Sequence, residues 1–208
     1  TGIAQQPANV TLCGATSTSF TIVTNGDEPY GITWQMSTDN GVTFADLAEG
    51  TDATTGLTFS GVDQATLNVS GVTVANSGVK FLCLLNFYLP SNAATLTVKN
   101  PVAITTQPVD QTVCVANGTA TFTTAATGDD LAYQWEVSTN GTTWSNYTGS
   151  GATSASISVV NPALAADGTQ YRVVVSGNAA CSSVTSSVAT LHINNPTITT
   201  APQALCHT

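Results

Sequence analysis

The chain has 208 residues, of which 42% are hydrophobic and only 7% are charged, and its formal net charge is −9. Three basic residues are too few to neutralise a phosphate backbone, and twelve acidic ones give the chain a negative charge that anionic lipid repels. We therefore expect no nucleic acid and no bare membrane as partner. No uninterrupted apolar run is long enough to cross a bilayer, which argues against direct membrane insertion.

The sequence repeats itself with a period of about a hundred residues, the size of one small β-domain. WQMSTDNGVTF, which begins at Trp34, returns as WEVSTNGTTW from Trp135, and the opening TGIAQQPANVTLC returns as VAITTQPVDQTVC. A third such opening, PTITTAPQALC, ends at Cys206. The repeats predict one domain over residues 1–100, a second over 101–194 and the start of a truncated third over 195–208. We therefore expect a piece of a longer array.

Short stretches of alternating apolar residues, separated by turn-forming residues, predict β-strands with one buried face and an all-β sandwich in each repeat. In the first repeat these sets are Phe20 and Ile22; Ile32, Trp34 and Met36; Leu67 and Val69; Phe81, Cys83 and Leu85; Ala94, Leu96 and Val98. In the second they are Ala120, Phe122 and Thr124; Tyr133, Trp135 and Val137; Ile157 and Val159; Tyr171, Val173 and Val175; Ala189, Leu191 and Ile193. The predicted core is centred on Trp34, Trp135, Phe20, Phe122, Tyr171 and Phe81.

The connections between these strands carry their own signals. Asn40-Gly41 and Asn140-Gly141 follow the tryptophan strands and predict type I′ hairpin turns, because Asn and Gly tolerate a positive φ. The alternation changes phase between Val188 and Ala189, which predicts a bulge in the last strand.

The five cysteines, none in a CxxC motif, favour an oxidising extracellular setting over a metal or redox site. Cys114 and Cys181 are the only pair in the second repeat, so we predict a disulfide between them. Cys13 and Cys83 are the analogous pair in the first repeat. The two pairings cannot share one geometry, because Cys83 lies within a strand and Cys181 follows one; a buried thiol at Cys83, packed against Phe20, is the alternative. Cys206 matches Cys13 and Cys114, so its expected partner lies beyond the fragment.

ADGTQYRV, Ala166–Val173, resembles the D-x-x-x-Y-x-C pattern of immunoglobulin domains, with Asp167, Tyr171 and Val173 in the three pattern positions. The resemblance makes Trp135 the buried tryptophan of strand C and places Phe122 where the strand-B cysteine would be. In the first repeat the equivalent places are taken by Trp34, Phe20, Ser77, Phe81 and Cys83. The implied fold is a tandem of immunoglobulin-like β-sandwich domains in which aromatic packing replaces the inter-sheet disulfide.

The whole unit, ITTQP…YQWEVSTNGTTW…LAADGTQYRVVVSG…VTSSVATL, resembles the immunoglobulin-like repeats of very large secreted and cell-surface proteins of Bacteroidota. Those proteins include gliding-motility adhesins and other cargo of the type IX secretion system. The resemblance implies an extracellular location and makes neighbouring repeats of the same chain the expected partners. It does not single out one function, since the same module decorates adhesins, enzymes and filaments.

Residue patterns for catalysis and metal binding are weak. His192 lies between Leu191 and Ile193, so alternation points it outward, and no G-x-S-x-G nucleophile motif occurs, so we expect no enzyme. Asp27-Glu28 and Asp129-Asp130 precede the tryptophan strands at equivalent positions. Solvated loop charge is the preferred interpretation of both pairs, with weak calcium binding as the alternative, and no other cofactor is expected.

The loop from Asn86 to Pro90 breaks the repeat pattern, because Phe87, Tyr88 and Leu89 stand where the second repeat has polar residues. We expect a hydrophobic joint to a preceding domain; stacking on a sugar ring or on a protein is the alternative.

The leading hypothesis from the sequence is a non-enzymatic segment of a long extracellular cell-surface protein, acting as a stalk or adhesive array. One alternative is a binding module pair that uses the Phe87-Tyr88 loop to recognise surface glycans or another cell-surface protein. The other is a filament component that exchanges its terminal strand, residues 195–208.

Overall fold

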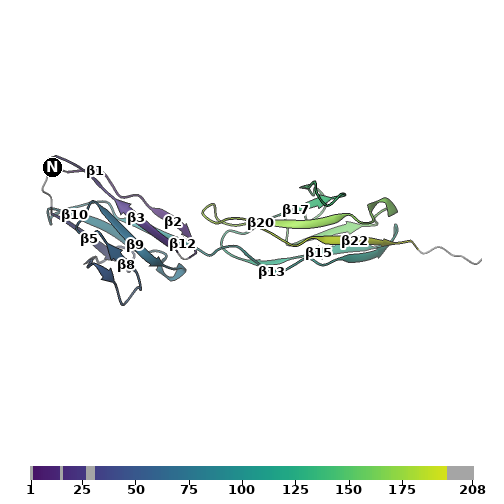
Figure 1. The fold of residues 1–208 in the computed structure, drawn as a ribbon, viewed down its shortest axis with the longest axis horizontal. Helices are drawn as coiled ribbons and strands as arrows, with labels where there is room; N and C mark the ends of the chain where they lie inside the picture. The colour runs from purple at the N-terminus through teal and green to yellow at the C-terminus, as the bar shows by residue number, and fades with distance from the viewer. Residues whose placement is uncertain (1, 15, 27–30, 196–208) are drawn as a thin grey trace, which may run out of the picture. The chain divides into compact units, whose positions relative to one another are not determined.

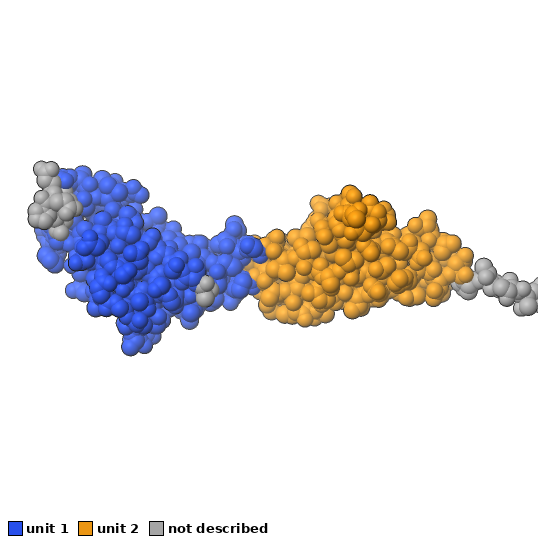
Figure 2. All heavy atoms as spheres, viewed as in Figure 1, with its two compact units in different colours: residues 1–101, 178–182 blue, residues 102–177, 183–208 orange. Residues whose placement is uncertain are grey.

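The computed structural model describes residues 2–14, 16–26 and 31–195, and it divides into two compact units. Unit 1 takes in the described residues up to Pro101 together with Asn178–Ser182, and unit 2 takes in Val102–Gly177 and the described residues from Ser183 onward (Figure 2). The main division of the chain falls between Pro101 and Val102, and the sequence did not indicate that residues 178–182 group with unit 1. The predicted third repeat falls almost wholly on residues 196–208, which lie outside the described residues, as do Cys206 and His207.

Unit 1 consists of two main β-sheets with a hydrophobic core between them (Figure 1). One sheet has the strand order β3 (Thr16–Thr21), β9 (Thr66–Val72), β8 (Thr58–Ser60) and β7 (Gly50–Thr51). The other has the order β2 (Val10–Cys13), β12 (Ala94–Lys99), β10 (Lys80–Leu85), β5 (Ile32–Ser37) and β6 (Ala45–Asp46), with β11 (Leu89–Pro90) also beside β10. β1 (Gly2–Gln5) pairs with β4 (Val23–Asn25), and the short 3-10 helix η1 spans Val74–Asn76.

Unit 2 repeats this arrangement. Its larger sheet has the order β14 (Gln111–Cys114), β22 (Ala189–Asn194), β20 (Gln170–Ser176), β17 (Ala132–Ser138) and β18 (Ser145–Asn146), with β21 (Val184–Thr185) also beside β20. The facing strands are β15 (Thr119–Thr123), paired with β19 (Ser156–Val160), and β13 (Ala103–Thr106), paired with β16 (Ala125–Thr127). The 3-10 helix η2 spans Leu164–Ala166. In both units the first strand of the larger sheet, β2 or β14, runs parallel to the last one, β12 or β22.

The residues predicted to form the core are buried in both units, each with at most 4% of its surface exposed: Trp34, Phe20, Phe81, Trp135, Phe122 and Tyr171. Phe20 packs on Phe81 with ring centroids 4.8 Å apart, and Phe122 packs on Tyr171 at 4.7 Å. These pairs connect the two sheets beside the place where an inter-sheet disulfide would stand, since Cys83 and Val173, two residues further along, take the second cysteine position. The core is therefore held by aromatic contact, which is favourable in such tilted geometry.

The tryptophan side chains satisfy their single donor in the same way in both units. Trp34 donates its indole N–H to the carbonyl oxygen of Gln64 at 2.8 Å, and Trp135 donates to that of Ser154 at 2.9 Å. Because a buried indole N–H without an acceptor is costly, this contact fixes the loop that passes over each tryptophan.

The predicted type I′ turns are only partly formed. Asn40 and Gly41 both have positive φ, 64° and 91°, but strand β5 ends at Ser37 and β6 begins at Ala45, so the connection is longer than a two-residue hairpin. In unit 2 only Gly141 has a positive φ, 73°, and the prediction at Asn140 is wrong. The physical reason is a side-chain acceptor: the carboxamide oxygen of Asn140 accepts the N–H groups of Thr142 and Thr143 and organises the loop instead.

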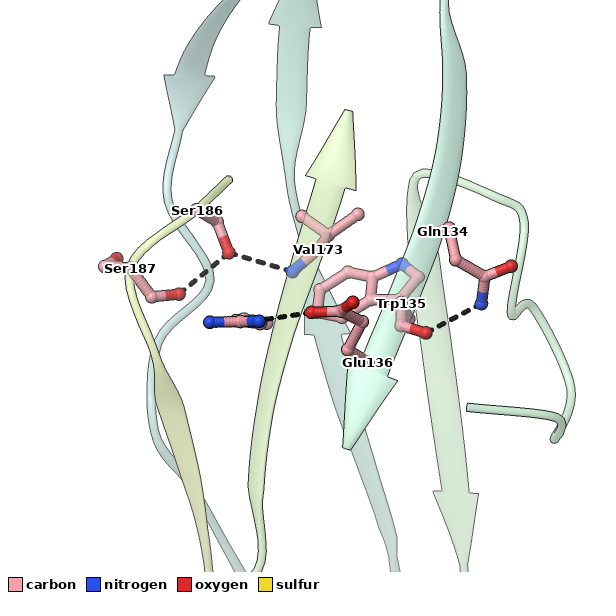
Figure 3. Close-up of polar contacts among 7 residues, drawn as sticks. Gln134, Trp135, Glu136, Val173, Ser186 and Ser187 are labelled. Atoms are coloured by element: carbon pink, nitrogen blue, oxygen red, sulfur yellow. Dashed lines mark hydrogen bonds and ion pairs between the residues drawn. The ribbon is translucent and has the colours of Figure 1, made fainter. Parts of the chain in front are cut away.

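The last strand of each unit is interrupted, as the phase change predicts for unit 2. There β21 ends at Thr185 and β22 begins at Ala189, and the hydroxyl of Ser186 accepts the N–H of Val173 at 2.9 Å (Figure 3). In unit 1 the hydroxyl of Ser91 accepts the N–H of Cys83 at 2.9 Å. A serine hydroxyl thus replaces a ladder acceptor at the same point of both sandwiches.

Candidate functional site

The cysteines pair differently from the prediction. The structure joins Cys13, at the end of β2, to Cys181, in the loop between β20 and β21, with Cα atoms 5.1 Å apart. Cys83 and Cys114 are free thiols, the first buried and the second exposed. Both predicted bonds, Cys114 to Cys181 and Cys13 to Cys83, are therefore corrected.

Strand register explains why Cys114 and Cys181 do not pair. Cys114 lies beside Asn194 at the end of β22, and β22 runs antiparallel to β20 with Ala189 opposite Tyr171. Cys114 is consequently at the end of the sheet where β20 begins, whereas Cys181 follows the end of β20. About ten residues of strand, at about 3.3 Å each, put about 30 Å between Cys114 and the far end of β20, against a Cα separation of about 6 Å in a disulfide.

Cys83 is unsuited to the other predicted bond because it faces the core in the middle of β10. Strand β12 lies between β10 and β2, so Cys13 and Cys83 are two strands apart. The side chain of Cys83 is fully buried in the same cluster as Phe20, which is the alternative that the sequence left open. Burial raises the pKa of the Cys83 thiol to about 11, so this residue is a packed hydrophobe and not a nucleophile.

The aromatic loop of unit 1 is a tight turn between β10 and β11. Tyr88 donates its N–H to the carbonyl oxygen of Leu85 at 3.4 Å, and the two central residues, Asn86 and Phe87, both have positive φ, 53° and 67°. The Asn86 carboxamide oxygen also accepts the N–H of Gly31 at 3.0 Å. Asn adopts this conformation readily, but a bulky residue such as Phe is an outlier there, so the turn stores backbone strain.

Two of the three predicted loop residues are presented to solvent. Phe87 is 74% exposed and Tyr88 is 76% exposed, while Leu89 is partly buried in β11. A side chain at Gly31 would collide with the Phe87 ring, since an added Cβ would lie 2.7 Å from it. The glycine therefore lets the ring lie against the backbone of the facing segment.

A cluster of charged and aromatic side chains on the outer face of unit 2 was not indicated by the sequence analysis. Arg172, on β20, donates from Nε to Glu136 Oε2, on β17, at 2.6 Å. The guanidinium carbon of Arg172 also lies 4.1 Å from the centroid of the Trp144 ring. The alternation around Trp135 and Tyr171 was the available signal, because it places Glu136 and Arg172 on the opposite face of neighbouring strands.

In the part of the chain that the structure describes, the other titratable side chains form no metal-binding cluster. His192 is exposed on β22, with Nε2 3.9 Å from Asp110 Oδ2. Asp27 and Glu28 lie outside the described residues. Among residues 2–14, 16–26 and 31–195, no three His, Cys, Asp or Glu side chains gather as metal ligands would. The described part of the chain also has no helix long and apolar enough to span a membrane.

A surface groove of about 530 Å³ lies beside η1 in unit 1. It is lined by hydroxyl, amide and aliphatic groups, namely Thr38, Asn40, Thr54, Thr55, Ala75, Asn76, Ser77, Gly78 and Val79. Its hydroxyl groups have no carboxylate or imidazole in this lining that could act as the general base which activates a hydroxyl nucleophile.

Residues 102–195, less than half of the chain, match a family model described as "Domain of unknown function (DUF8696)". None of the curated proteins matches the chain.

Several solved structures are similar to the chain. The I-band fragment I67–I69 of titin is 20% identical, with a TM-score of 0.60 over 93% of this chain and 65% of the fragment. DIP-gamma Ig1+Ig2 is 16% identical, with a TM-score of 0.51 over 92% of this chain and 96% of its own. The N-terminal four Ig domains of Dscam1 isoform 6.9 are 19% identical, with a TM-score of 0.51 over 90% and 43%. At such identities the likeness shows the fold, and it confirms the predicted tandem of immunoglobulin-like β-sandwiches.

Proposed function

We propose that the chain is a non-enzymatic structural or adhesive segment of a long extracellular cell-surface protein, a stalk or array of immunoglobulin-like repeats. The observation that carries this proposal is the bond between Cys13 and Cys181. It spans a sequence separation of 168 residues and so encloses most of both repeats in one covalent loop.

Such a loop has a mechanical consequence. A force applied to the two ends of the chain passes from Cys13 through the disulfide to Cys181, and the residues between them bear no load while the bond is intact. Only about 40 residues lie outside the loop, so the chain can lengthen by no more than about 150 Å at about 3.6 Å per residue. A segment that resists extension in this way suits a stalk.

The proposed location and partners rest on three supports. A structural disulfide persists in oxidising compartments, which favours the cell exterior. The similar fragments of titin and Dscam1 are themselves strings of several Ig domains, which favours neighbouring repeats as partners. The sequence resemblance to repeats of Bacteroidota adhesins adds gliding motility and type IX secretion as the proposed setting of the parent protein.

Single-molecule stretching of the full chain between its two ends tests the mechanical role. We expect the oxidised chain to lengthen by at most about 150 Å, and the reduced chain to lengthen by about 600 Å more, the contour of about 167 released residues at about 3.6 Å each. Cys181→Ser should behave like the reduced chain, and Cys114→Ser like the oxidised wild type. Full extension of the oxidised wild type would contradict the proposal.

A second candidate function is favoured by the strained turn at Phe87. An exposed aromatic residue kept at a positive φ is more costly than a glycine, and such strain is found where a side chain must be held for a contact. We therefore propose, as the alternative, that Phe87 and Tyr88 bind a surface glycan or another cell-surface protein. Among the similar structures, DIP-gamma is seen with Dpr11 Ig1 bound to it.

A glycan array probed with the full chain tests this alternative. Signal that disappears on Phe87→Ala and Tyr88→Ala, and persists on Val109→Ala, an exposed residue of unit 2, is the expected result. Equal signal for all three variants, or none for the wild type, would count against sugar recognition by the loop.

A further inference from the structure

Cys13 and Cys114 occupy the same position in their sandwiches. Cys13 is the last residue of β2 and lies beside Lys99, the last residue of β12, in a parallel pair. Cys114 is the last residue of β14 and lies beside Asn194, the last residue of β22, again in a parallel pair. The two cysteines are therefore equivalent by register and not only by sequence.

The residue after each cysteine makes the corresponding hydrogen bond. Gly14 donates its N–H to the carbonyl oxygen of Lys99 at 2.9 Å, and Val115 donates to that of Asn194 at 3.0 Å. In the sequence, each of these acceptor residues is followed directly by an Asn-Pro pair, Asn100-Pro101 after Lys99 and Asn195-Pro196 after Asn194. In unit 1 this asparagine is part of the disulfide site, because Cys181 Sγ lies 3.6 Å from the carbonyl oxygen of Asn100.

The two cysteines differ in whether they form a disulfide. Cys13 is bonded to a cysteine from the loop between β20 and β21, which belongs to the next repeat along the chain, whereas Cys114 is an exposed thiol. The corresponding loop of the first repeat, between β10 and β11, has Phe87 and Tyr88 and no cysteine. Neither remaining cysteine of the described residues can bond to Cys114, because Cys181 is bonded to Cys13 and Cys83 is fully buried in the core. Cys114 thus has the same strand position as the disulfide-bonded Cys13, but it has no disulfide partner among residues 2–14, 16–26 and 31–195.

We propose that Cys114 forms a disulfide with a cysteine in the corresponding loop of the repeat that follows the second one, the repeat whose opening is PTITTAPQALC. Consecutive repeats would then be joined by overlapping covalent loops, each running from the counterpart of β2 in one repeat to the counterpart of the β20–β21 loop in the next. This inference rests on the proposed repeat array and adds a rule for its cross-links, namely that a disulfide joins each repeat to the next.

The bond forms by ordinary thiol–disulfide exchange. Two cysteine thiols lose two protons and two electrons, and one molecule of a small disulfide such as oxidised glutathione accepts them and becomes two thiols. No metal or further group is needed. The exposed position of Cys114 provides the access that exchange requires.

A chain extended by one module tests the rule. Residues 196–208 are replaced by a second copy of residues 101–195, in which the counterpart of Cys114 is serine, and the protein is refolded with reduced and oxidised glutathione. Alkylation by iodoacetamide, located by mass spectrometry, reports which thiols are free. We expect Cys114 to be alkylated in the unextended chain and to be protected by at least ten-fold in the extended one.

Two variants of the extended chain identify the partner. Serine at the appended copy's counterpart of Cys181 should restore alkylation of Cys114, whereas Cys181→Ser should leave Cys114 protected. A Cys114–Cys114 dimer, a bond from Cys114 to Cys181, or an alkylatable Cys114 in the extended chain would each overturn the rule. If Cys13 and Cys181 stay bonded in that last case, the proposed stalk survives; if they too are alkylated, both proposals fail.

Discussion

The hydroxyl of Ser186 replaces a backbone carbonyl oxygen as the acceptor for the N–H of Val173. It accepts the backbone N–H of Val173 at 2.9 Å and donates to the carbonyl oxygen of Ser187 at 2.8 Å, at the point where the last strand of unit 2 is interrupted. Ser91 makes the same pair of contacts, with the N–H of Cys83 and the carbonyl oxygen of Asn92, both at 2.9 Å. The interruption therefore leaves neither the N–H of Val173 nor that of Cys83 without an acceptor.

Ser186→Ala should destabilise unit 2 by about 1–3 kcal/mol, because the fully buried N–H of Val173 loses its acceptor without gaining water. Urea unfolding followed by amide exchange of the β20 residues measures the loss. Ser183→Ala, at an exposed position before β21, is the matched control and should change stability by less than about 0.5 kcal/mol. Equal effects of the two substitutions would show that the hydroxyl contact does not matter.

Asp39 makes the loop after β5 sensitive to acid. Hydrogen bonds from the side chain and the backbone N–H of Thr43, followed by that from Ser37, hold the pKa of the Asp39 carboxyl well below its usual range. A lowered pKa means that the stabilisation is present above the ordinary value of about 3.8 and is lost as the pH falls below it. Amide exchange at Val42 and Thr43 between pH 6 and pH 2 should show this loss in the wild type.

Asn140 provides the opposite test, because it accepts the same loop N–H groups without a titratable proton. Asp39→Asn should make the first loop insensitive to acid, and Asn140→Asp should make the second loop sensitive. Asp52, whose pKa is lowered mainly by the Thr55 side chain, titrates in both variants and serves as the internal reference. An unchanged pH profile in both variants would remove the carboxyl as the cause.

Arg172 should contribute to unit 2 through two separate contacts. Its ion pair with Glu136 joins side chains that are 29% and 19% exposed, so the coupling in a double-mutant cycle of Arg172→Met and Glu136→Gln should be about 0.5–1 kcal/mol. High salt should weaken this coupling. A second cycle with Trp144→Ala should give a similar coupling from the stacked guanidinium, with less dependence on salt. Zero coupling in both cycles would leave the cluster without energetic effect.

The thiols should react in a fixed order at pH 8. In a Cys206→Ser background, iodoacetamide should label Cys114 within minutes, while Cys83 stays unlabelled until the chain is unfolded, because it is fully buried and its pKa is raised to about 11. Cys13 and Cys181 should be labelled only after reduction. Mass spectrometry of the labelled peptides gives the order, and early labelling of Cys83 would contradict its place in the core.

Replacement of Phe87 should not weaken the fold. Phe87→Gly keeps the left-handed backbone but removes its steric cost of about 1–2 kcal/mol, and the flexibility of glycine offsets part of this gain. The free energy of unfolding of unit 1 should therefore stay the same or rise by up to about 1 kcal/mol. Phe81→Ala, in the core, should cost about 3–5 kcal/mol. A large loss on Phe87→Gly in urea unfolding would make the aromatic turn a structural element and remove the argument for binding.

The alternation of apolar residues was sufficient to identify the sandwiches and their cores. Trp34, Phe81, Trp135 and Tyr171 lie two residues from other apolar positions in short strands, and a period of two has only one solution when one face is buried. The internal repeat predicted two modules, since both copies carry the same pattern. Local sequence thus determined which residues are buried and how many modules to expect.

The pairing of Cys13 with Cys181 was decided by the tertiary structure alone. Counting cysteines within a repeat pairs Cys114 with Cys181, but strand order and register place these two at opposite ends of the sheet. The Arg172–Glu136 pair and the strained turn at Phe87 were hidden for a related reason, since cross-strand neighbours and backbone dihedrals depend on which strands meet. Contacts between residues far apart in the sequence follow from topology, and a period of two along one strand contains no information about the strand beside it.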